Sequence, residues 1–267
     1  SGYSANLGVF SALRDEIDWV LQDKLNHASL IDGNRLIGLP VQRYLHNNLE
    51  SLEKKLKKQT GTGLIVTDNV FSMDGDRANI EGIKTIAAQS GALLMQDDAH
   101  GFGIFESTIP DHSIYMATLG KAAGVMGAFV SGSSDLIEFL IQKSRPYIYT
   151  TAISPSMCVA TLKSLELIKK GEQKEKLFSN INYFKDCAET LDLHFEPSES
   201  AIQPLIIGSS NKALSLSNKL FEAGYFVSAI RPPTVPPNTA RLRFTLSANH
   251  NFSQIESLLQ KVKDVMA

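Results

Sequence analysis

The sequence has few of the residues that mark a secreted, membrane-bound or metal-binding protein. Only two of its 267 residues are cysteine, Cys158 and Cys187, and they form no CxxC pair. This usage predicts reduced thiols in the helical core of a cytoplasmic protein, and it disfavours a disulfide framework or a zinc site. No apolar run approaches the length of a membrane-spanning helix, so we predict no membrane partner.

The sequence also lacks an excess of charge of either sign. Its 26 basic and 28 acidic side chains give a net charge of −2, which offers no general attraction to nucleic acid. The densest basic cluster is not interleaved with aromatic residues, so it predicts a solvated helix face. That cluster is Lys54, Lys55, Lys57 and Lys58. We therefore predict no nucleic-acid partner.

In the first part of the chain, short apolar segments alternate with helical ones. The apolar segments that predict strands are 63–68, 92–96, 114–118 and 127–131. Helices are predicted at 80–89 and 135–143 from the spacing of their apolar residues. Continuous apolar strands that alternate with helices are typical of a parallel sheet covered on both faces. The fold class predicted from this pattern is α/β.

The pattern changes between Pro146 and Pro155. Two long amphipathic helices, at about 156–170 and 172–191, lead into strands of a more antiparallel, α+β character. We therefore expect a large domain over residues 1–152 and a smaller C-terminal α+β domain over residues 153–267. The glycine-serine turn chemistry of the first residues predicts that the large domain is N-terminally incomplete.

The candidate catalytic and binding residues follow two neighbouring predicted strands. Lys121 stands in a Gly-Lys turn after strand 114–118, and Asp97 and His100 follow strand 92–96. Because α/β sheets bind ligands at the carboxyl ends of their strands, we expect these side chains to face one pocket. A lysine in a niche of small residues beside acidic groups suits Schiff-base chemistry with pyridoxal phosphate (PLP).

These residues also admit two other interpretations. A nucleotide-binding P-loop fails, because Ala122 stands where that motif has Ser or Thr. A divalent metal site built from Asp97, Asp98 and His100 stays open, since carboxylate and imidazole ligands suit several ions. No second His/Glu cluster in the sequence completes its coordination shell, so no metal is predicted.

Several motifs together resemble the α-oxoamine synthase family of fold-type-I PLP-dependent enzymes. The motifs are Val70-Phe-Ser-Met-Asp-Gly-Asp76, Asp97-Asp-Ala-His-Gly101 and Thr118-Leu-Gly-Lys-Ala122. Further segments resemble the branch of biotin biosynthesis that condenses L-alanine with a pimeloyl thioester, carried by coenzyme A or an acyl carrier protein. Those segments are 200–205, 229–236 and 240–246. The resemblance implies a cytoplasmic, homodimeric, PLP-dependent acyltransferase with a mainly parallel sheet in its large domain.

The resemblance also implies roles for individual residues. Lys121 would bind the cofactor and move the α-proton, Asp97 would pair with the ring nitrogen, and His27 would stack on the ring. With His100, these form the expected catalytic set. The other expected cofactor contacts are Gly2, Tyr3, Ser72, Thr118, Thr150 and Thr151. The expected substrate contacts are Thr234, Arg243 and His27.

The sequence departs from the family pattern in three places, one of which is Phe102, where a small or β-branched residue is typical. The family's N-terminal portion is absent, and the link between His100 and Lys121 is several residues shorter than usual. Two alternatives to the alanine-using branch stay open. One is a sister enzyme of the family that uses glycine or serine, and the other is a non-catalytic partner subunit, which would be expected to lack Lys121.

Overall fold

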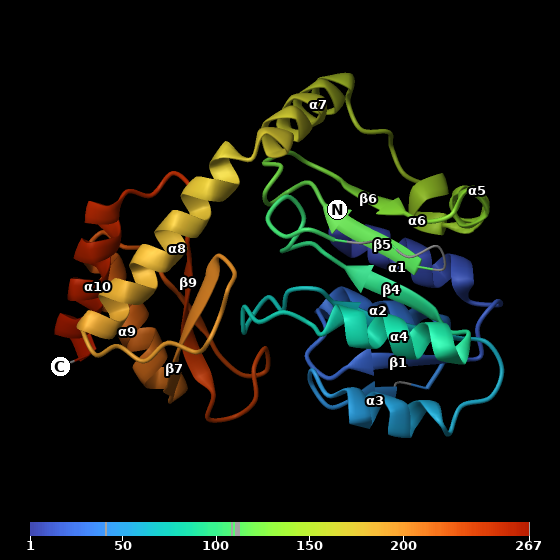
Figure 1. Cartoon of the computed structure of the whole chain (residues 1–267), viewed down its shortest axis with the longest axis horizontal. Coiled ribbons are helices and arrows are strands. Elements are labelled where there is room, and N and C mark those ends of the chain that lie inside the picture. The colour runs from blue at the N-terminus through green and yellow to red at the C-terminus, as the bar shows by residue number, and fades with distance from the viewer. Residues whose placement is uncertain (41, 108, 110–112, 267) are drawn as a thin grey trace. The chain divides into compact units, whose positions relative to one another are not determined.

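The computed structural model of the chain describes residues 1–40, 42–107, 109 and 113–266 (Figure 1). These residues group into two compact units. One unit comprises Ser1–Phe71 and Arg77–Lys169, and the other comprises Ser72–Asp76 and Lys170–Ala267. The spatial proximity of residues thus puts the boundary between the two units at 169/170, whereas the sequence predicted a domain boundary at 152/153. The assignment of independent domains stays a prediction.

The first unit is built on a six-stranded sheet with the order β2-β1-β3-β4-β5-β6. The pairings from β2 to β5 are all parallel, which confirms the mainly parallel sheet. Every residue of β3 and β5 is buried, as a sheet covered on both faces requires. The strands are β1 Trp19–Asp23, β2 Gln42–Tyr44, β3 Gly63–Asp68, β4 Leu93–Asp97, β5 Ser113–Thr118 and β6 Ala128–Ser131.

The strand predicted at 127–131 forms, but β6 runs antiparallel to β5. A parallel return needs a crossover of roughly a dozen residues or more, usually including a helix. The link from Thr118 to Ala128 is too short for one, so the chain turns back directly beside β5. This short return contains Lys121.

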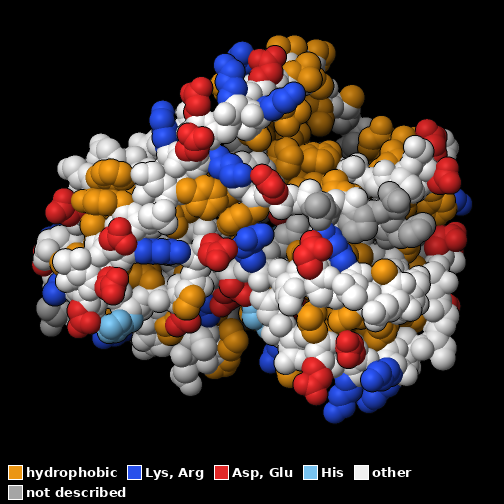
Figure 2. All heavy atoms as spheres, in the orientation of Figure 1, with side chains coloured by type: hydrophobic (Ala, Val, Ile, Leu, Met, Phe, Trp, Pro, Cys, Tyr) orange, Lys and Arg blue, Asp and Glu red, His pale blue; other side chains and the backbone are white. Residues whose placement is uncertain are grey.

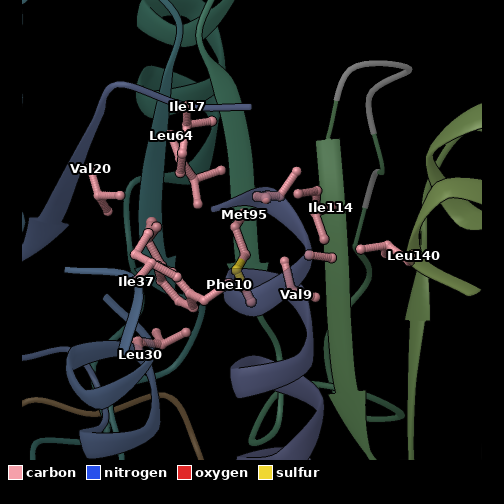
Figure 3. Close-up of a cluster of buried hydrophobic side chains, with 13 residues drawn as sticks. Val9, Phe10, Ile17, Val20, Leu30, Ile37, Leu64, Met95, Ile114 and Leu140 are labelled. Atoms are coloured by element: carbon pink, nitrogen blue, oxygen red, sulfur yellow. The ribbon is translucent and has the colours of Figure 1, made fainter. Parts of the chain in front are cut away.

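Helices cover both faces of this sheet (Figure 1). On one face, α1, α2 and α5 enclose a cluster that includes Phe10, Met95 and Leu140 (Figure 3). On the other face, Leu52 of α3 and Ile83 of α4 pack with side chains of the sheet. The helices of this unit are α1 Gly2–Leu13, α2 Ala28–Ile37, α3 Leu49–Leu56, α4 Ile80–Ser90, α5 Ser134–Lys143, α6 Arg145–Ile148 and α7 Pro155–Lys170.

The second unit is an α+β layer, as predicted. Its strands β7, β9 and β8 form an antiparallel sheet in that order. Phe184, Leu220, Phe244 and Leu259 are fully or almost fully buried in this unit. Its elements are α8 Glu172–Thr190, β7 Ile202–Gly208, α9 Ser210–Glu222, β8 Ser228–Ile230, β9 Ala240–Thr245 and α10 Phe252–Met266.

The segment Ser72–Asp76 belongs to the second unit because side chains of that unit bind it. Arg241 Nη1 donates to Asp74 Oδ1 at 2.6 Å, and Arg243 Nη1 donates to the Ser72 carbonyl at 2.9 Å. The Arg241 side chain is almost wholly buried, so this ion pair is shielded from solvent on the arginine side. Two adjacent β9 arginines on one face of the strand therefore hold the segment.

The two cysteines lie on helices, as expected, but not in a core. Cys158 on α7 is exposed and Cys187 on α8 is partly buried, and both are free thiols. The expectation of core thiols was therefore wrong, because neither side chain is fully buried. Within the described ranges, no helix is long and apolar enough to cross a membrane.

Candidate active site

A pocket lies at the carboxyl ends of the parallel strands of the first unit. It gathers residues from strand ends, from the turn after β5 and from the N-terminal ends of two helices, as expected for this sheet type. The predicted site residues that line it are Gly2, Tyr3, His27, Asp97, His100, Thr118 and Lys121. Ser29, Asp68, Ala99 and Met116 complete the lining.

The turn between β5 and β6 places Lys121 at the pocket. Leu119 N donates to the Gly127 carbonyl at 2.9 Å, and Gly124 N donates to the Lys121 carbonyl at 2.9 Å. Gly124 and Gly127 both have positive φ angles, which glycine adopts without strain. The small residues predicted to permit close backbone approach therefore close the turn and leave the lysine side chain at the strand end.

Asp97 is the last residue of β4 and is almost completely buried. Its Oδ2 accepts a hydrogen bond from Asn6 Nδ2 at 2.7 Å, and its Oδ1 accepts one from the Ala99 backbone N–H at 2.9 Å. Burial raises the pKa of this carboxyl, and these two bonds and the positive charge of Lys121 oppose the rise. The carboxylate thus has donors fixed on both oxygens before any ligand binds.

Asp68 is a pocket residue that the sequence analysis missed. It ends β3, and it pairs in register with Asp97 on the neighbouring strand. It is buried, and its Oδ2 accepts a hydrogen bond from the His27 backbone N–H at 2.7 Å. Burial, and then the charge of Asp97, raise the pKa of Asp68 well above the ordinary carboxyl value. Of the pair, Asp97 has more hydrogen-bond donors, and these favour its ionised form more than that of Asp68.

His27 stands at the N-cap of α2, before the first helical residue. Its Nδ1 lies 2.7 Å from Ser29 Oγ and accepts a hydrogen bond from the Ser29 backbone N–H at 3.2 Å. The cap geometry and the Asp68 bond hold the imidazole in the pocket lining. A side chain that lines a pocket and is fixed in this way can cover one face of a flat ligand.

The N-terminus of α1 faces the same pocket through Gly2 and Tyr3. Unpaired N–H groups and the helix dipole make such an end suitable for a phosphate. A Cβ on Gly2 would lie 3.4 Å from Thr118 Cβ, so the N-terminus of α1 lies in contact distance of the Thr118 side chain. The pocket thus combines a phosphate site, an amine and a buried carboxylate, and this donor set fits PLP.

Other predicted site residues lie outside this lining. Thr150 and Thr151 are exposed beyond α6, and in the described ranges they are not lining residues. Ser72, Thr234 and Arg243 belong to the second unit. There Thr234 is exposed, and burial lowers the pKa of the Arg243 guanidinium.

The alternative metal site finds no support in the geometry. Asp98 accepts short hydrogen bonds from Tyr115 Oη at 2.6 Å and from Ser107 Oγ at 2.7 Å. In the described part of the chain, no three His, Cys, Asp or Glu side chains are grouped so as to hold a metal ion. Asp98 therefore ties β5 to the loop that follows His100.

The family of the chain follows from its sequence as well as its fold. The model of the family described as aminotransferase class I and II matches residues 1–262, so the chain belongs to that family. It has the fold of type I PLP-dependent enzymes, with PLP as cofactor.

Curated relatives indicate the branch of this family to which the chain is similar in sequence. The chain is 49% identical to the 8-amino-7-oxononanoate synthase of Pseudomonas entomophila, covering 99% of this chain and 71% of that protein. It is 47% identical to the synthase of the same name from Saccharophagus degradans, covering 100% of this chain and 70% of that protein. These relatives confirm the predicted family branch and a PLP-dependent acyltransferase.

Solved structures agree with this assignment. A serine palmitoyltransferase from Sphingomonas wittichii superposes with a TM-score of 0.92 at 28% identity, covering 99% of this chain and 70% of that one. An 8-amino-7-oxononanoate synthase from Francisella tularensis gives a TM-score of 0.83 at 32% identity, covering 99% of this chain and 80% of that one. The fold prediction is therefore confirmed.

Proposed function

We propose that this chain catalyses the decarboxylative condensation of L-alanine with a pimeloyl thioester. The products are 8-amino-7-oxononanoate, carbon dioxide and the free thiol of coenzyme A or an acyl carrier protein, a step of biotin biosynthesis. The observation that carries the proposal is that one pocket joins Lys121, Asp97 and His27 in a chain 49% identical to such a synthase. The proposal places the reaction in the cytoplasm, because the low cysteine content and the free thiols suit a reducing compartment.

The proposed roles start with the groups on the strand ends. PLP, when bound, supplies an electron-withdrawing ring that stabilises negative charge on the α-carbon of the amino acid. Asp97 keeps the proton on the ring nitrogen, for which its two hydrogen bonds orient it. Lys121 binds the cofactor in the resting enzyme and moves the α-proton of alanine with its ε-amine once substrate has displaced it.

The other predicted residues hold the cofactor and the substrates. His27 covers one ring face, while His100 and Ser72 bind the phenolic oxygen. Gly2, Tyr3 and Thr118 hold the phosphate at the N-terminus of α1. Thr150 and Thr151 extend to the phosphate of a second copy. Arg243 binds the carboxylate of alanine through two N–H groups, and Thr234 lines the acyl site.

We propose a second copy of this chain as its partner in a homodimer. Helix α7 buries none of its side chains in the described chain, although it carries several large apolar residues. Hydrophobic side chains gather over this helix on the face shown in Figure 2. The exposed apolar residues of α7 are Val159, Leu162, Leu165 and Leu167. Burial of such a surface favours association.

A sister reaction with serine is the second candidate, because the palmitoyltransferase structure superposes more closely than the synthase structure. The higher identity to the named synthases favours alanine. The change in the visible spectrum of the PLP-loaded protein on titration with alanine, glycine or serine separates the two. Alanine should give the strongest response, and a response to serine alone would support the sister enzyme.

The test of the proposed function is the variant Lys121→Ala. We expect it to make no product from alanine and pimeloyl-CoA, and to lose the borohydride-sensitive visible absorption of the lysine-bound cofactor. The control is Lys143→Ala, which removes an exposed lysine from the end of α5. A Lys121→Ala enzyme that keeps both product formation and absorption contradicts the proposal.

A further inference from the structure

Asn6 links two functional side chains that come from different elements. It lies on α1 and is completely buried. Its Nδ2 donates one hydrogen to Asp97 Oδ2 at 2.7 Å and the other to Ser29 Oγ at 2.8 Å. The amide therefore bridges the carboxylate that ends β4 and the hydroxyl in the first turn of α2.

The orientation of this amide is set by Asp97. Rotating the amide by half a turn would place Asn6 Oδ1 against the Asp97 carboxylate, where both groups can only accept hydrogen bonds. In the observed orientation Asn6 Oδ1 is buried, without a hydrogen-bond partner among the described residues. Such a group has an energetic cost, and the bond from Nδ2 to a charged acceptor offsets it.

The same bridge determines which way the Ser29 hydroxyl points. Since both Nδ2 hydrogens of Asn6 are used, Ser29 Oγ accepts from Asn6 and its own hydrogen remains to be donated. His27 Nδ1 lies 2.7 Å from that oxygen. It also accepts from the Ser29 backbone N–H, at the longer distance of 3.2 Å. An Nδ1 that faces two donors carries no hydrogen, so a neutral His27 carries its hydrogen on Nε2.

We propose that Asn6 is a positioning residue that couples the orientation of Asp97 to the tautomer of His27 through the Ser29 hydroxyl. The inference rests on the proposed function for its relevance to catalysis, but not for its geometry. No role was predicted for Asn6 from the sequence.

The variant Asn6→Asp tests this coupling. The oxygen that replaces Nδ2 carries at most one hydrogen, which Asp97 takes, so Ser29 must donate to residue 6 and can no longer donate to His27. Nδ1 then faces one donor, the Ser29 backbone N–H, and the Ser29 oxygen can accept from it, so the tautomer with its hydrogen on Nδ1 should become more populated. In PLP-loaded protein labelled with ¹⁵N-histidine, the ring nitrogen shifts of His27, assigned with His27→Gln, should report a change in tautomer ratio of about fivefold or more.

The Ser29→Ala background shows whether the effect passes through the hydroxyl. In that background, Asn6→Asp should leave the tautomer ratio unchanged, because the Ser29 hydroxyl that links residue 6 to His27 is already absent. The control Asn34→Ala removes another fully buried amide, on α2, and should leave His27 as in the wild type. If Asn6→Asp does not fold, Asn6→Ala takes its place, with a smaller shift expected in the same direction.

The outcomes separate this inference from the proposed function. An unchanged tautomer in the Asn6 variant, or an equal shift with and without the Ser29 hydroxyl, overturns the coupling while alanine turnover by the wild type still stands. A wild type that makes no product from alanine and pimeloyl-CoA overturns the proposed function, while the nitrogen shifts still decide the coupling. In an active enzyme, alanine α-proton exchange should fall roughly 10- to 100-fold in Asn6→Asp.

Discussion

At the residue scale, the site is dominated by two buried carboxyls on neighbouring strands. Asp68 and Asp97 are register partners, and both are nearly inaccessible to solvent. Asp97 has donors on both oxygens, whereas Asp68 accepts one bond, from the His27 backbone. The unequal donor supply favours the ionised form of Asp97 more than that of Asp68.

This inequality predicts how stability depends on pH. The folded-state pKa of Asp68 is raised, so the folded protein binds more protons than the unfolded chain above the unfolded carboxyl pKa of about 3.9. The contribution of Asp68 to the free energy of unfolding is therefore full below that pH. It is lost as the pH rises toward the folded-state pKa.

Asp68→Asn should remove this loss, because its amide oxygen still accepts the His27 N–H and carries no charge. We expect the unfolding free energy of cofactor-free Asp68→Asn to fall less steeply with rising pH than that of the wild type. Urea unfolding across this pH range measures it, with the exposed Asp192→Asn as control. Parallel pH curves for wild type and Asp68→Asn would count against the assignment.

At the scale of elements, a hydrogen-bonded triad joins β4, β5 and the loop after His100. Asp98 follows β4, is almost fully buried and accepts from Tyr115 of β5 and from Ser107 of the loop. Burial raises the pKa of Asp98, and the two hydroxyl donors oppose that rise. The triad therefore makes a buried carboxyl tolerable and fastens Ser107 of this loop near the site.

Tyr115→Phe removes one of these donors without changing the shape of the side chain. Since a buried carboxyl loses a partner, we expect a destabilisation of about 1–3 kcal/mol. Urea unfolding at neutral pH measures this, and the exposed Tyr147→Phe should stay within about 0.5 kcal/mol of wild type. Equal stability of the two variants would show that the Tyr115 hydroxyl does not support Asp98.

At the scale of the whole molecule, α7 carries an apolar surface that the chain itself leaves uncovered. The exposed fractions of Val159 and Leu162 are 67% and 64%, which is unusual for large apolar side chains grouped on one helix. A second copy that covers this surface would remove it from water, at about 25 cal/mol per Å² of apolar area.

Leu162→Glu places a charge in this surface and should convert the expected dimer into a monomer. Sedimentation analysis at several protein concentrations measures the change. Lys163→Glu alters the charge of the neighbouring exposed position, outside the apolar set, and should leave the dimer intact. A monomeric wild type, or a dimeric Leu162→Glu variant, would contradict the proposed assembly.

The strands and the main site residues were predictable because each leaves a local signal. Strand β3 was predicted at 63–68 because a strand buried on both faces must be apolar throughout. Lys121 and Asp97 were predicted because they directly follow such strands. Helices α7 and α8 were predicted from their length and the spacing of their apolar residues.

Contacts between distant residues left no such signal. Asn6 is 91 positions from Asp97, and an asparagine inside a helix looks like any solvent-facing polar residue until the helix is packed. Asp68 ends its strand just as Asp97 does, but its effect on Asp97 depends on the strands being register partners. The direction of β6 depended on how few residues join it to β5.

The sequence by itself determined which segments form strands and helices, which residues stand at the strand ends, and the chemistry that a lysine beside a carboxylate offers. These properties depend on side-chain polarity and spacing along the chain. Only the tertiary structure decided the direction of β6, the pairing of Asp68 with Asp97 and the bridge made by Asn6. Hydrogen bonds and carboxyl pKa values depend on distances of a few ångströms and on burial, which arise only when separate elements pack together.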